Sequence, residues 1–362
     1  MLTIVTFIIL ISFLVLIHEL GHFVIAKLSG VRVEEFGIGL PPRIFGVRRG
    51  ETVYSINLLP IGGFVRLLGE DSSDVAMSDP RAFCNRPHLQ QAGILTAGVF
   101  MNFILGVFLL TIVFARWGVP GIGAVLQIDE VLSNSPASEV NLEIGEEIEA
   151  FAVIGSEEFV KVDMEGNILS FFEENLGQEV ELRVYSKAGE SGASSRIVRV
   201  RLRDEVKEGE GILGIGFTMV PHVEYSQVGL FRAPVVAIAK TGEMMGTFLK
   251  SIGDLFGRFF RIQQVPEGVV GPVGIARITG QVVREGWDSL LYFVAILSIS
   301  LAAFNILPLP ALDGGRLVMV LGEFITGRSV KANVQQWVNI AGLVFLFLLM
   351  GWVTVWDVMK IF

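Results

Sequence analysis

The 362-residue sequence has little charge and almost no cysteine. Only 18% of its residues are charged, 52% are hydrophobic and the mean hydropathy is +0.61, which excludes an ordinary soluble protein of this size. The single cysteine, Cys84, excludes an internal disulfide framework and a cysteine-rich zinc module, and we interpret it as a free thiol. The first expectation is therefore a membrane protein without cross-links.

The net charge of -9 is unevenly distributed along the chain. Residues 117–230 contain 21 acidic and 8 basic residues, a net charge of -13, which leaves +4 for the remainder. This distribution indicates one acidic soluble domain inserted into a mildly basic membrane protein.

Four stretches reach the length of about 20 apolar residues that a bilayer span requires. They are residues 2–26, 93–115, 289–312 and 337–356. A cleaved signal peptide is the alternative for the first stretch, but the basic n-region and the small-residue cleavage site are missing. Basic residues gather between the first and second spans and between the third and fourth. These loops are therefore predicted to be cytoplasmic, with the N-terminus and the acidic domain extracytoplasmic.

The first apolar stretch contains HELGH, residues 18–22. Helical residues four apart share one face about 6 Å along the axis, so His18 and His22 can bind one metal ion. Glu19 beside them can act as a general base, which is the HExxH arrangement of zinc peptidases. Polar histidines at a helix interface are the alternative. A glutamate within hydrocarbon is energetically costly, which favours the functional interpretation.

A catalytic zinc ion usually has three protein ligands and one position for water. His88 and His222 fall in a loop and in the acidic domain, away from the first span. Asp313 is a better candidate because it follows the uncharged third span in NILPLPALDGG, residues 305–315, where two prolines interrupt the helix. Irregular backbone at membrane depth is tolerated where it lines a wet cavity. The alternative is an aspartate that caps a helix or lies in an interfacial turn.

These motifs resemble the site-two protease family of intramembrane zinc metalloproteases, most closely its bacterial regulator of sigma-E protease branch. The resemblance covers nearly the whole chain and includes FGIG at 36–39, GGFVRLLGE at 62–70, AGVFMN at 97–102 and GPVGIA at 271–276. It implies that the zinc (Zn2+) ligands are His18, His22 and Asp313 and that Glu19 is the catalytic base. It also implies that Asn305 lies in the active-site cleft and holds the substrate backbone or the developing oxyanion.

Two features depart from the pattern of the family. The second-span motif AGPxxN has Val99 in place of the proline, although Asn102 is retained, and we predict that Asn102 contributes to substrate binding. The best-known bacterial members have two tandem PDZ modules, whereas this chain has room for one. We therefore expect a single-PDZ variant.

Residues 51–69 combine β-branched and aromatic residues with a Pro-Ile-Gly-Gly break, which predicts a β-hairpin. The resemblance implies that this hairpin folds back into the membrane beside the catalytic helix. A helical substrate must be unwound before cleavage, and an exposed strand edge can hold the opened segment by strand addition. We predict that the substrate-binding residues there are Gly62, Gly63, Phe64 and Val65. The alternative is a hairpin that only supports the first loop.

Residues 121–221 alternate short β-rich runs with turn residues. The segment 133–151 resembles part of a PDZ domain, and 189–195 predicts a flexible hairpin tip. Such a domain either binds a peptide or excludes bulky substrate ectodomains. Residues 229–262 have apolar residues at helical intervals between charges, which predicts an amphipathic helix on the membrane surface. GVVGPVGIA, residues 268–276, is expected to form a turn that leads toward the third span.

The predicted fold class is a polytopic α-helical membrane protein with about four transmembrane helices, a membrane-associated β-hairpin and an inserted extracytoplasmic PDZ-like α+β domain. The predicted domains are the first part of the membrane core (1–116), the PDZ-like domain (117–222), an amphipathic linker or brace (223–288) and the second part of the membrane core (289–362).

We interpret the chain as a zinc endopeptidase of the bacterial inner membrane that cleaves single-span proteins, such as anti-sigma-factor-like substrates, during regulated proteolysis. The lipid bilayer and a peptide at the PDZ-like domain are the other expected partners, and no nucleic acid is expected. One alternative is a catalytically silent membrane scaffold, which the presence of Glu19 and the lack of a fourth ligand candidate disfavour. Another is a metal or proton transporter, which usually shows internal repeats that this sequence lacks.

Overall fold

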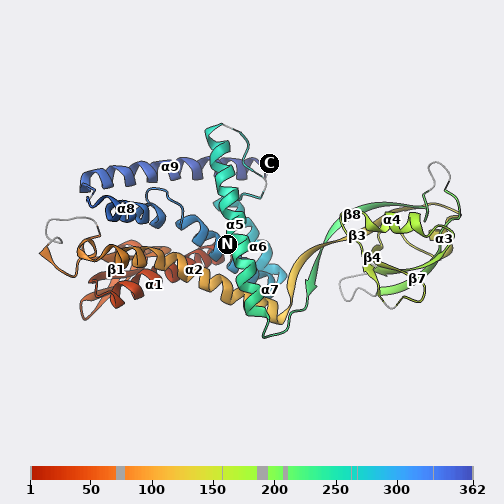
Figure 1. Cartoon of the computed structure of the whole chain (residues 1–362), viewed down its shortest axis with the longest axis horizontal. Coiled ribbons are helices and arrows are strands. Elements are labelled where there is room, and N and C mark those ends of the chain that lie inside the picture. The colour runs from red at the N-terminus through yellow and green to blue at the C-terminus, as the bar shows by residue number, and fades with distance from the viewer. Residues whose placement is uncertain are drawn as a thin grey trace. The chain divides into compact units, whose positions relative to one another are not determined.

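The computed structural model describes residues 2–70, 78–156, 158–185, 195–206, 211–261, 263–266, 268–328 and 330–360. The chain divides into two compact units, one formed by Met1–Trp117 with Val228–Phe362 and the other by Gly118–Gln227. The first unit consists mainly of long helices and the second mainly of strands (Figure 1). The sheet unit is therefore an insertion in the helical unit.

Four helices in the described part of the first unit are long and apolar enough to cross a membrane. They are α1 (Leu2–Leu28), α2 (His88–Arg116), α7 (Trp287–Asn305) and α9 (Ala332–Met359). Large apolar side chains such as Ile9, Phe100 and Phe347 are exposed on them, as expected where a helix faces lipid. The expectation of a membrane protein with four apolar helices and a sheet domain is confirmed at this level. The third helix ends at Asn305, before the predicted position 312, because Pro308 and Pro310 cannot continue it.

Small residues bring α2 close to α1 and to α7. A β-carbon on Gly21 of α1 would overlap the carbonyl oxygen of Ala97 in α2. A β-carbon on Gly106 of α2 would lie 2.6 Å from Cγ1 of Ile299 in α7. Glycines of this kind let membrane helices approach each other at backbone distance. The HELGH turn of α1 is therefore held against the middle of α2.

A two-stranded sheet follows α1 and consists of β1 (Val33–Arg49) and β2 (Thr52–Leu67). Residues 35–38 of β1 lie between two segments of β2, 53–56 on one side and 63–66 on the other. The predicted hairpin therefore has a different first strand. Its turn lies at Gly50 and Glu51, and the Pro-Ile-Gly-Gly segment instead bends β2 around β1, with Gly62 at a φ of +74°.

The turn of this hairpin is tied to the end of α1. The carboxylate of Glu51 accepts hydrogen bonds from Lys27 Nζ at 2.9 Å and from Arg81 Nη1 at 2.8 Å. The hydrogen bond from Lys27, together with both positive charges, lowers the pKa of Glu51 below its ordinary value. The charged turn, the end of α1 and Arg81 of the first loop therefore form one connected group.

Three further helices complete the described part of the first unit with the short 3-10 helix Phe83–Asn85. They are α5 (Ala233–Phe260), α6 (Pro272–Glu285) and α8 (Asp313–Thr326). The amphipathic pattern of 229–262 corresponds to α5. The expectation of a turn at GPVGIA was wrong, because Pro272 is at the first position of α6, where its fixed φ and missing N–H are favourable.

A buried carboxylate of the fourth membrane helix explains the glycines of GPVGIA. Asp357 accepts hydrogen bonds from the backbone N–H groups of Gly271 at 3.2 Å and Gly274 at 2.9 Å. A β-carbon on Gly271 would lie 2.7 Å from the carboxylate. Asp357 therefore accepts hydrogen bonds from amides that have no partner within α6, and its negative charge lies at the positive end of this helix. These interactions offset the cost of an acidic residue in the apolar helix α9.

The second unit contains a sheet with strand order β7-β6-β4-β3-β8, and β5 pairs with β4 beside this path. The strands are β3 (Val119–Val131), β4 (Glu147–Val153), β5 (Val160–Lys161), β6 (Glu179–Tyr185), β7 (Ser195–Arg201) and β8 (Ile215–Ser226). Two helices accompany them, α3 (Pro136–Glu139) and α4 (Asn167–Glu174). Fully buried side chains such as Leu126, Ile148 and Leu182 form the core between sheet and helices.

Two sequence expectations for this unit concern its C-terminal boundary and the tip of one hairpin. β3 and β8 pair from Val119 with Ser226 to Val131 with Ile215, so the unit continues past the predicted boundary at 222. β6 and β7 pair antiparallel, and residues 189–194 of the predicted tip between them lie outside the described residues.

Candidate active site

The two histidines of HELGH lie together on the face of α1 that packs against α2. Each is 6% exposed, and His18 Nε2 lies 3.1 Å from His22 Nε2. This is the expected result of a four-residue spacing on a helix, because such residues stand one above the other on the same face. The helix therefore presents two imidazole nitrogens to one point.

Asp313 reaches the same point from the other end of the sequence. Its Oδ2 lies 2.9 Å from His18 Nε2 and 3.3 Å from His22 Nε2. The turn after α7 folds back tightly on the start of α8, because β-carbons on Gly314 and Gly315 would overlap the carbonyl oxygens of Leu307 and Leu309. The two glycines of LDGG are thus required for the return of the chain that places the carboxylate.

The three donor atoms fit a zinc ion. They lie within 4.8 Å of one another, and no other group of three His, Cys, Asp or Glu residues in the described part of the chain does so. Tetrahedral zinc with bonds of about 2.0–2.1 Å separates its ligand atoms by ~3.3 Å. The distances between the donor pairs, 2.9, 3.1 and 3.3 Å, are close to this value. Two imidazoles and one carboxylate are a donor set of catalytic zinc sites, which leave one position for water.

His22 is oriented by the backbone of α2. Its Nδ1 lies 2.7 Å from the carbonyl oxygen of Ile94, so Nδ1–H donates to this oxygen and Nε2 keeps its lone pair for the metal. Zinc-binding histidines typically have such a hydrogen bond on the second nitrogen. The packing of α2 on α1 thus fixes the tautomer of His22, one of the three candidate ligands.

Gly98 of α2 lies directly against both imidazoles. A β-carbon at this position would overlap His22 Nε2 and would lie 2.7 Å from His18 Nε2. Any side chain here would therefore fill the space in front of the ligand atoms. Sequence reasoning missed Gly98, although it lies inside the AGVFMN motif, because a glycine in an apolar helix carries no chemical signal of its own.

Glu19 lies beside the ligands and contacts the hairpin. The backbone N–H of Val65 donates to Glu19 Oε2 at 3.1 Å. A β-carbon on Gly63 would lie 3.0 Å from the carbonyl oxygen of Gly37 and 3.9 Å from Glu19 Cγ. The predicted substrate-binding segment Gly62–Val65 therefore passes close to the predicted base, and its glycines permit this approach.

Two further contacts hold the same segment in place. Ser12 of α1 donates from Oγ to the carbonyl oxygen of Pro60 at 2.9 Å and accepts from the N–H of Gly62 at 3.2 Å. Beyond the strand, Glu70 forms an ion pair with Arg316 of α8, and Glu70 Oε2 accepts from the N–H of Leu67 at 3.3 Å. Arg316 is one turn beyond Asp313, so this ion pair connects the hairpin to the helix of the third ligand.

The two predicted asparagines occupy different surroundings. Asn102 is fully buried in α2, with Nδ2 3.3 Å from His18 Nδ1, so the structure brings it behind the ligand. Asn305 is half-buried at the end of α7, where the turn toward Asp313 begins. Of the remaining histidines, His88 contacts the ring of Phe324 and His222 belongs to β8 in the other unit.

Comparisons with known proteins agree with this geometry. The chain matches peptidase family M50 over residues 6–349. It is 34% identical over 358 residues to a Clostridium perfringens protein named "Putative zinc metalloprotease", with 96% of each chain covered. It is 30% identical to the chloroplastic membrane metalloprotease ARASP of Arabidopsis thaliana, covering 93% of this chain and 74% of the relative. It is 28% identical to the regulator of sigma-W protease RasP of Bacillus subtilis, covering 99% of both.

A match over most of the chain and relatives above 30% identity confirm three predictions, namely the family, the enzyme class and the zinc cofactor. The four apolar helices agree with a multi-pass arrangement. The chain belongs to peptidase family M50, the site-2 proteases, and is a multi-pass membrane zinc metalloprotease.

Proposed function

We propose that His18, His22 and Asp313 hold the catalytic zinc ion and that Glu19 is the general base of peptide hydrolysis. The convergence of the three donor atoms within 4.8 Å is the observation that carries this assignment. Zinc, when bound, polarises the scissile carbonyl and makes water more acidic. Glu19 takes the proton from the attacking water and returns it to the leaving amine.

The strand edge beside Glu19 supports a role for Gly62, Gly63, Phe64 and Val65 in substrate binding. Residues 63–66 pair with β1 on one side, while the N–H of Val65 is directed to Glu19 on the other. An extended substrate can add to this second side, where its carbonyl oxygen replaces Glu19 as the acceptor of the Val65 N–H. Substrate binding then releases the base for catalysis. We extend this proposal to Asn305, which ends α7 just before the turn that carries Asp313, as a further contact of the extended substrate.

The substrates that suit this site are single-span membrane proteins. Two of the three donor atoms lie on α1, which is long and apolar enough to cross a membrane, and the third follows the end of α7. A peptide bond must therefore come to them from within or near the bilayer and must be unwound first. The relative from Bacillus subtilis is named a regulator of sigma-W protease, which supports a regulatory substrate such as an anti-sigma factor. The basic loops support a bacterial inner-membrane location with the N-terminus and the second unit outside the cytoplasm.

Removal of zinc tests this function. The purified chain in detergent should cleave a single-span reporter protein, and incubation with 1,10-phenanthroline should stop cleavage because the site loses its Lewis acid. Addition of excess Zn2+ after removal of the chelator should restore product, measured on a gel. A non-chelating phenanthroline isomer is the control. Undiminished cleavage by the metal-depleted protein would contradict the proposal.

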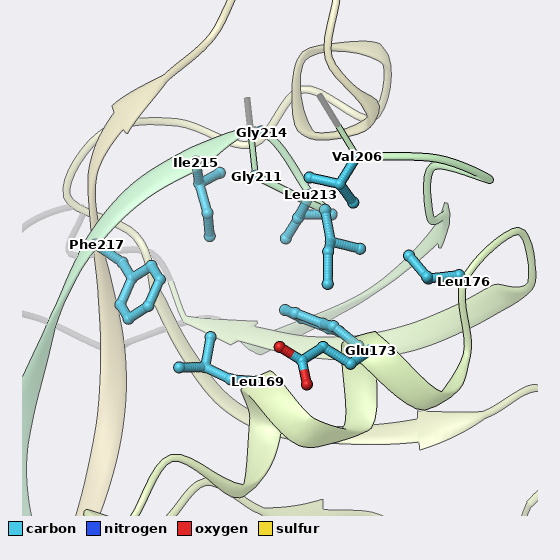
Figure 2. Close-up of a pocket in the computed structure, with 11 residues that line it drawn as sticks. Leu169, Glu173, Leu176, Val206, Gly211, Leu213, Gly214, Ile215 and Phe217 are labelled. Atoms are coloured by element: carbon cyan, nitrogen blue, oxygen red, sulfur yellow. The ribbon is translucent and has the colours of Figure 1, made fainter. Parts of the chain in front are cut away.

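A pocket in the second unit supports a second role, the binding of an extended peptide. The pocket has a volume of about 330 Å³ and lies between α4 and β8. Leu169 and Glu173 of α4 face Ile215 and Phe217 of β8 across it (Figure 2). β8 is the last strand of the sheet path, so its outer edge is open to strand addition. We propose that this PDZ-like unit binds a peptide with an apolar residue in the pocket and a basic residue near Glu173.

Leu169→Asp should weaken binding of a fluorescein-labelled octapeptide that contains a lysine and ends in valine. The change places a charge in the apolar pocket, so affinity of the full-length protein should fall at least about 10-fold, as measured by fluorescence anisotropy. Ile197→Asp introduces the same charge at an exposed position of β7 and should leave the affinity for the peptide unchanged. Equal peptide affinity in wild type and Leu169→Asp would leave only the size-filter role for this unit.

A further inference from the structure

Three residues of α2 form a stripe that faces the two histidines of α1. Ile94, Gly98 and Asn102 are spaced four residues apart, so they lie along one side of the helix. The carbonyl oxygen of Ile94 contacts His22 Nδ1 at 2.7 Å, Gly98 adjoins both rings, and the amide of Asn102 lies 3.3 Å from His18 Nδ1. Each imidazole thus has one partner on α2 at its Nδ1.

The polar atoms around Asn102 require an explanation. Asn102 is 0% exposed, and its Oδ1 is buried without a hydrogen-bond partner, while Nδ2 is the atom near His18 Nδ1. His18 Nε2 faces Asp313 and His22, so this nitrogen is the ligand atom and Nδ1 carries the hydrogen. Asn102 Nδ2 and His18 Nδ1–H, which are both donors, then face each other, while the acceptor Oδ1 of Asn102 has no partner. A half-turn of the amide about its Cβ–Cγ bond brings Oδ1 to Nδ1–H, so that the acceptor of Asn102 faces the donor of His18.

We propose that Asn102 is a positioning residue whose Oδ1 accepts the hydrogen bond of His18 Nδ1–H and thereby directs Nε2 to the metal. It performs for His18 what the carbonyl of Ile94 performs for His22. The carbonyl oxygen of Ile94, which contacts His22, lies about two helical turns from Asn102 along α2. A side chain at position 102 is therefore needed to provide the acceptor for His18. This inference rests on the proposed assignment of His18 as a zinc ligand.

The backbone around Asn102 supports a fixed position for its side chain. The hydroxyl of Ser298 in α7 donates to the carbonyl oxygen of Asn102 at 2.8 Å, and Ser298 is fully buried. The residue is therefore held between α1 and α7 and is fully buried in this structure. In this proposal Asn102 is part of the AGVFMN motif because it orients the ring of His18.

Zinc affinity and the absorption spectrum of the Co2+-substituted protein test this role. Asn102→Leu removes the acceptor at similar volume and should weaken zinc binding roughly 10- to 100-fold in competition with a chelator. It should also change the visible absorption of bound Co2+, because the ring of His18 is no longer oriented. Asn102→Asp retains an acceptor oxygen and should keep zinc affinity within a few-fold of wild type. Asn102→Ala provides the same comparison if the leucine variant does not fold.

Two controls separate this inference from the assignment on which it rests. Thr111→Ala removes a side-chain hydrogen bond within α2, from Thr111 Oγ1 to the carbonyl oxygen of Val107 at 2.7 Å, and should leave the chelator competition unchanged. His18→Ala should lose zinc if His18 is a ligand, and zinc retention in that variant would overturn the ligand assignment itself. If His18→Ala loses zinc but Asn102→Leu binds it as wild type does, the positioning role is overturned. A folded Asn102→Asp variant that is as weak as Asn102→Leu overturns it as well.

Discussion

Replacement of Glu19 by glutamine should eliminate detectable cleavage of a transmembrane reporter while the zinc content stays at the wild-type level. Glutamine has the same shape and can still accept the hydrogen bond from the N–H of Val65, so the local structure is preserved. It cannot take a proton from water, and loss of general-base catalysis costs roughly 10²- to 10⁴-fold in rate. Co-expression with a tagged single-span substrate, followed by immunoblotting, measures the effect.

The matched control is a glutamate of the first unit without a proposed role in the site. Glu323→Gln also changes a glutamate to its amide, but its partner is the N–H of Val330 just beyond the end of α8, and it should retain substantial activity. Zinc content of each variant is measured by mass spectrometry on purified protein. Cleavage by Glu19→Gln at the wild-type rate would reject Glu19 as the base. Loss of zinc from that variant would instead indicate that Glu19 has a structural part in the metal site.

Asp313→Asn should remove zinc from the protein. The change replaces the one negatively charged ligand by a neutral amide, while asparagine remains acceptable in the first turn of α8. Loss of an outer partner of a ligand already costs roughly 10- to 100-fold in affinity, so loss of a ligand should cost more. Dialysis against a weak chelator followed by metal analysis should find zinc in the wild type and little in the variant.

Asp357→Asn is a suitable control for this experiment. Asp357 is a buried aspartate near the end of α9, and its partners are the N–H groups of Gly271 and Gly274 at the start of α6. Its replacement should affect thermal stability without changing zinc content after dialysis. Full zinc content in Asp313→Asn would exclude the aspartate as a ligand and leave two histidines, too few for a catalytic site of the proposed kind.

The pairing of His18 and His22 and the irregular turn before Asp313 were predictable because both are encoded locally. The four-residue spacing of His18 and His22 places both rings on one helical face wherever α1 packs. The prolines before Asp313 predict an irregular segment after an uncharged helix, and the structure has this turn. Both inferences need only the geometry of a single helix or turn.

The surroundings of the site depend on distant contacts that no local pattern contains. Gly98 and Ile94 reach the histidines only because α2 packs on α1 in one particular register. Glu70 and Arg316 are 246 positions apart in the sequence. The same holds for Asp357 and the start of α6, and GPVGIA was consequently expected to be a turn when it begins a helix.

The hairpin shows a related limit. A Pro-Ile-Gly-Gly segment is a typical turn signal, so β2 was expected to fold on itself. In the structure this segment bends β2 around residues 35–38, which receive pairing from both sides. Strand partners depend on which edges are available, and the propensities of the residues do not identify them.

The cap that Asp357 provides for α6 has a consequence for the assembly of the membrane unit. The β-carbon that Gly280 of α6 lacks would lie 2.7 Å from Cγ2 of Thr3, so α6 packs tightly on the helix that carries HELGH. The amides of Gly271 and Gly274 receive their carboxylate only after α9 has been synthesised and inserted. In a nascent chain that has not yet reached this stage, the amides at the start of α6 lack this carboxylate, so the contact of α6 with the first helix can reach its final form only after α9 is in place.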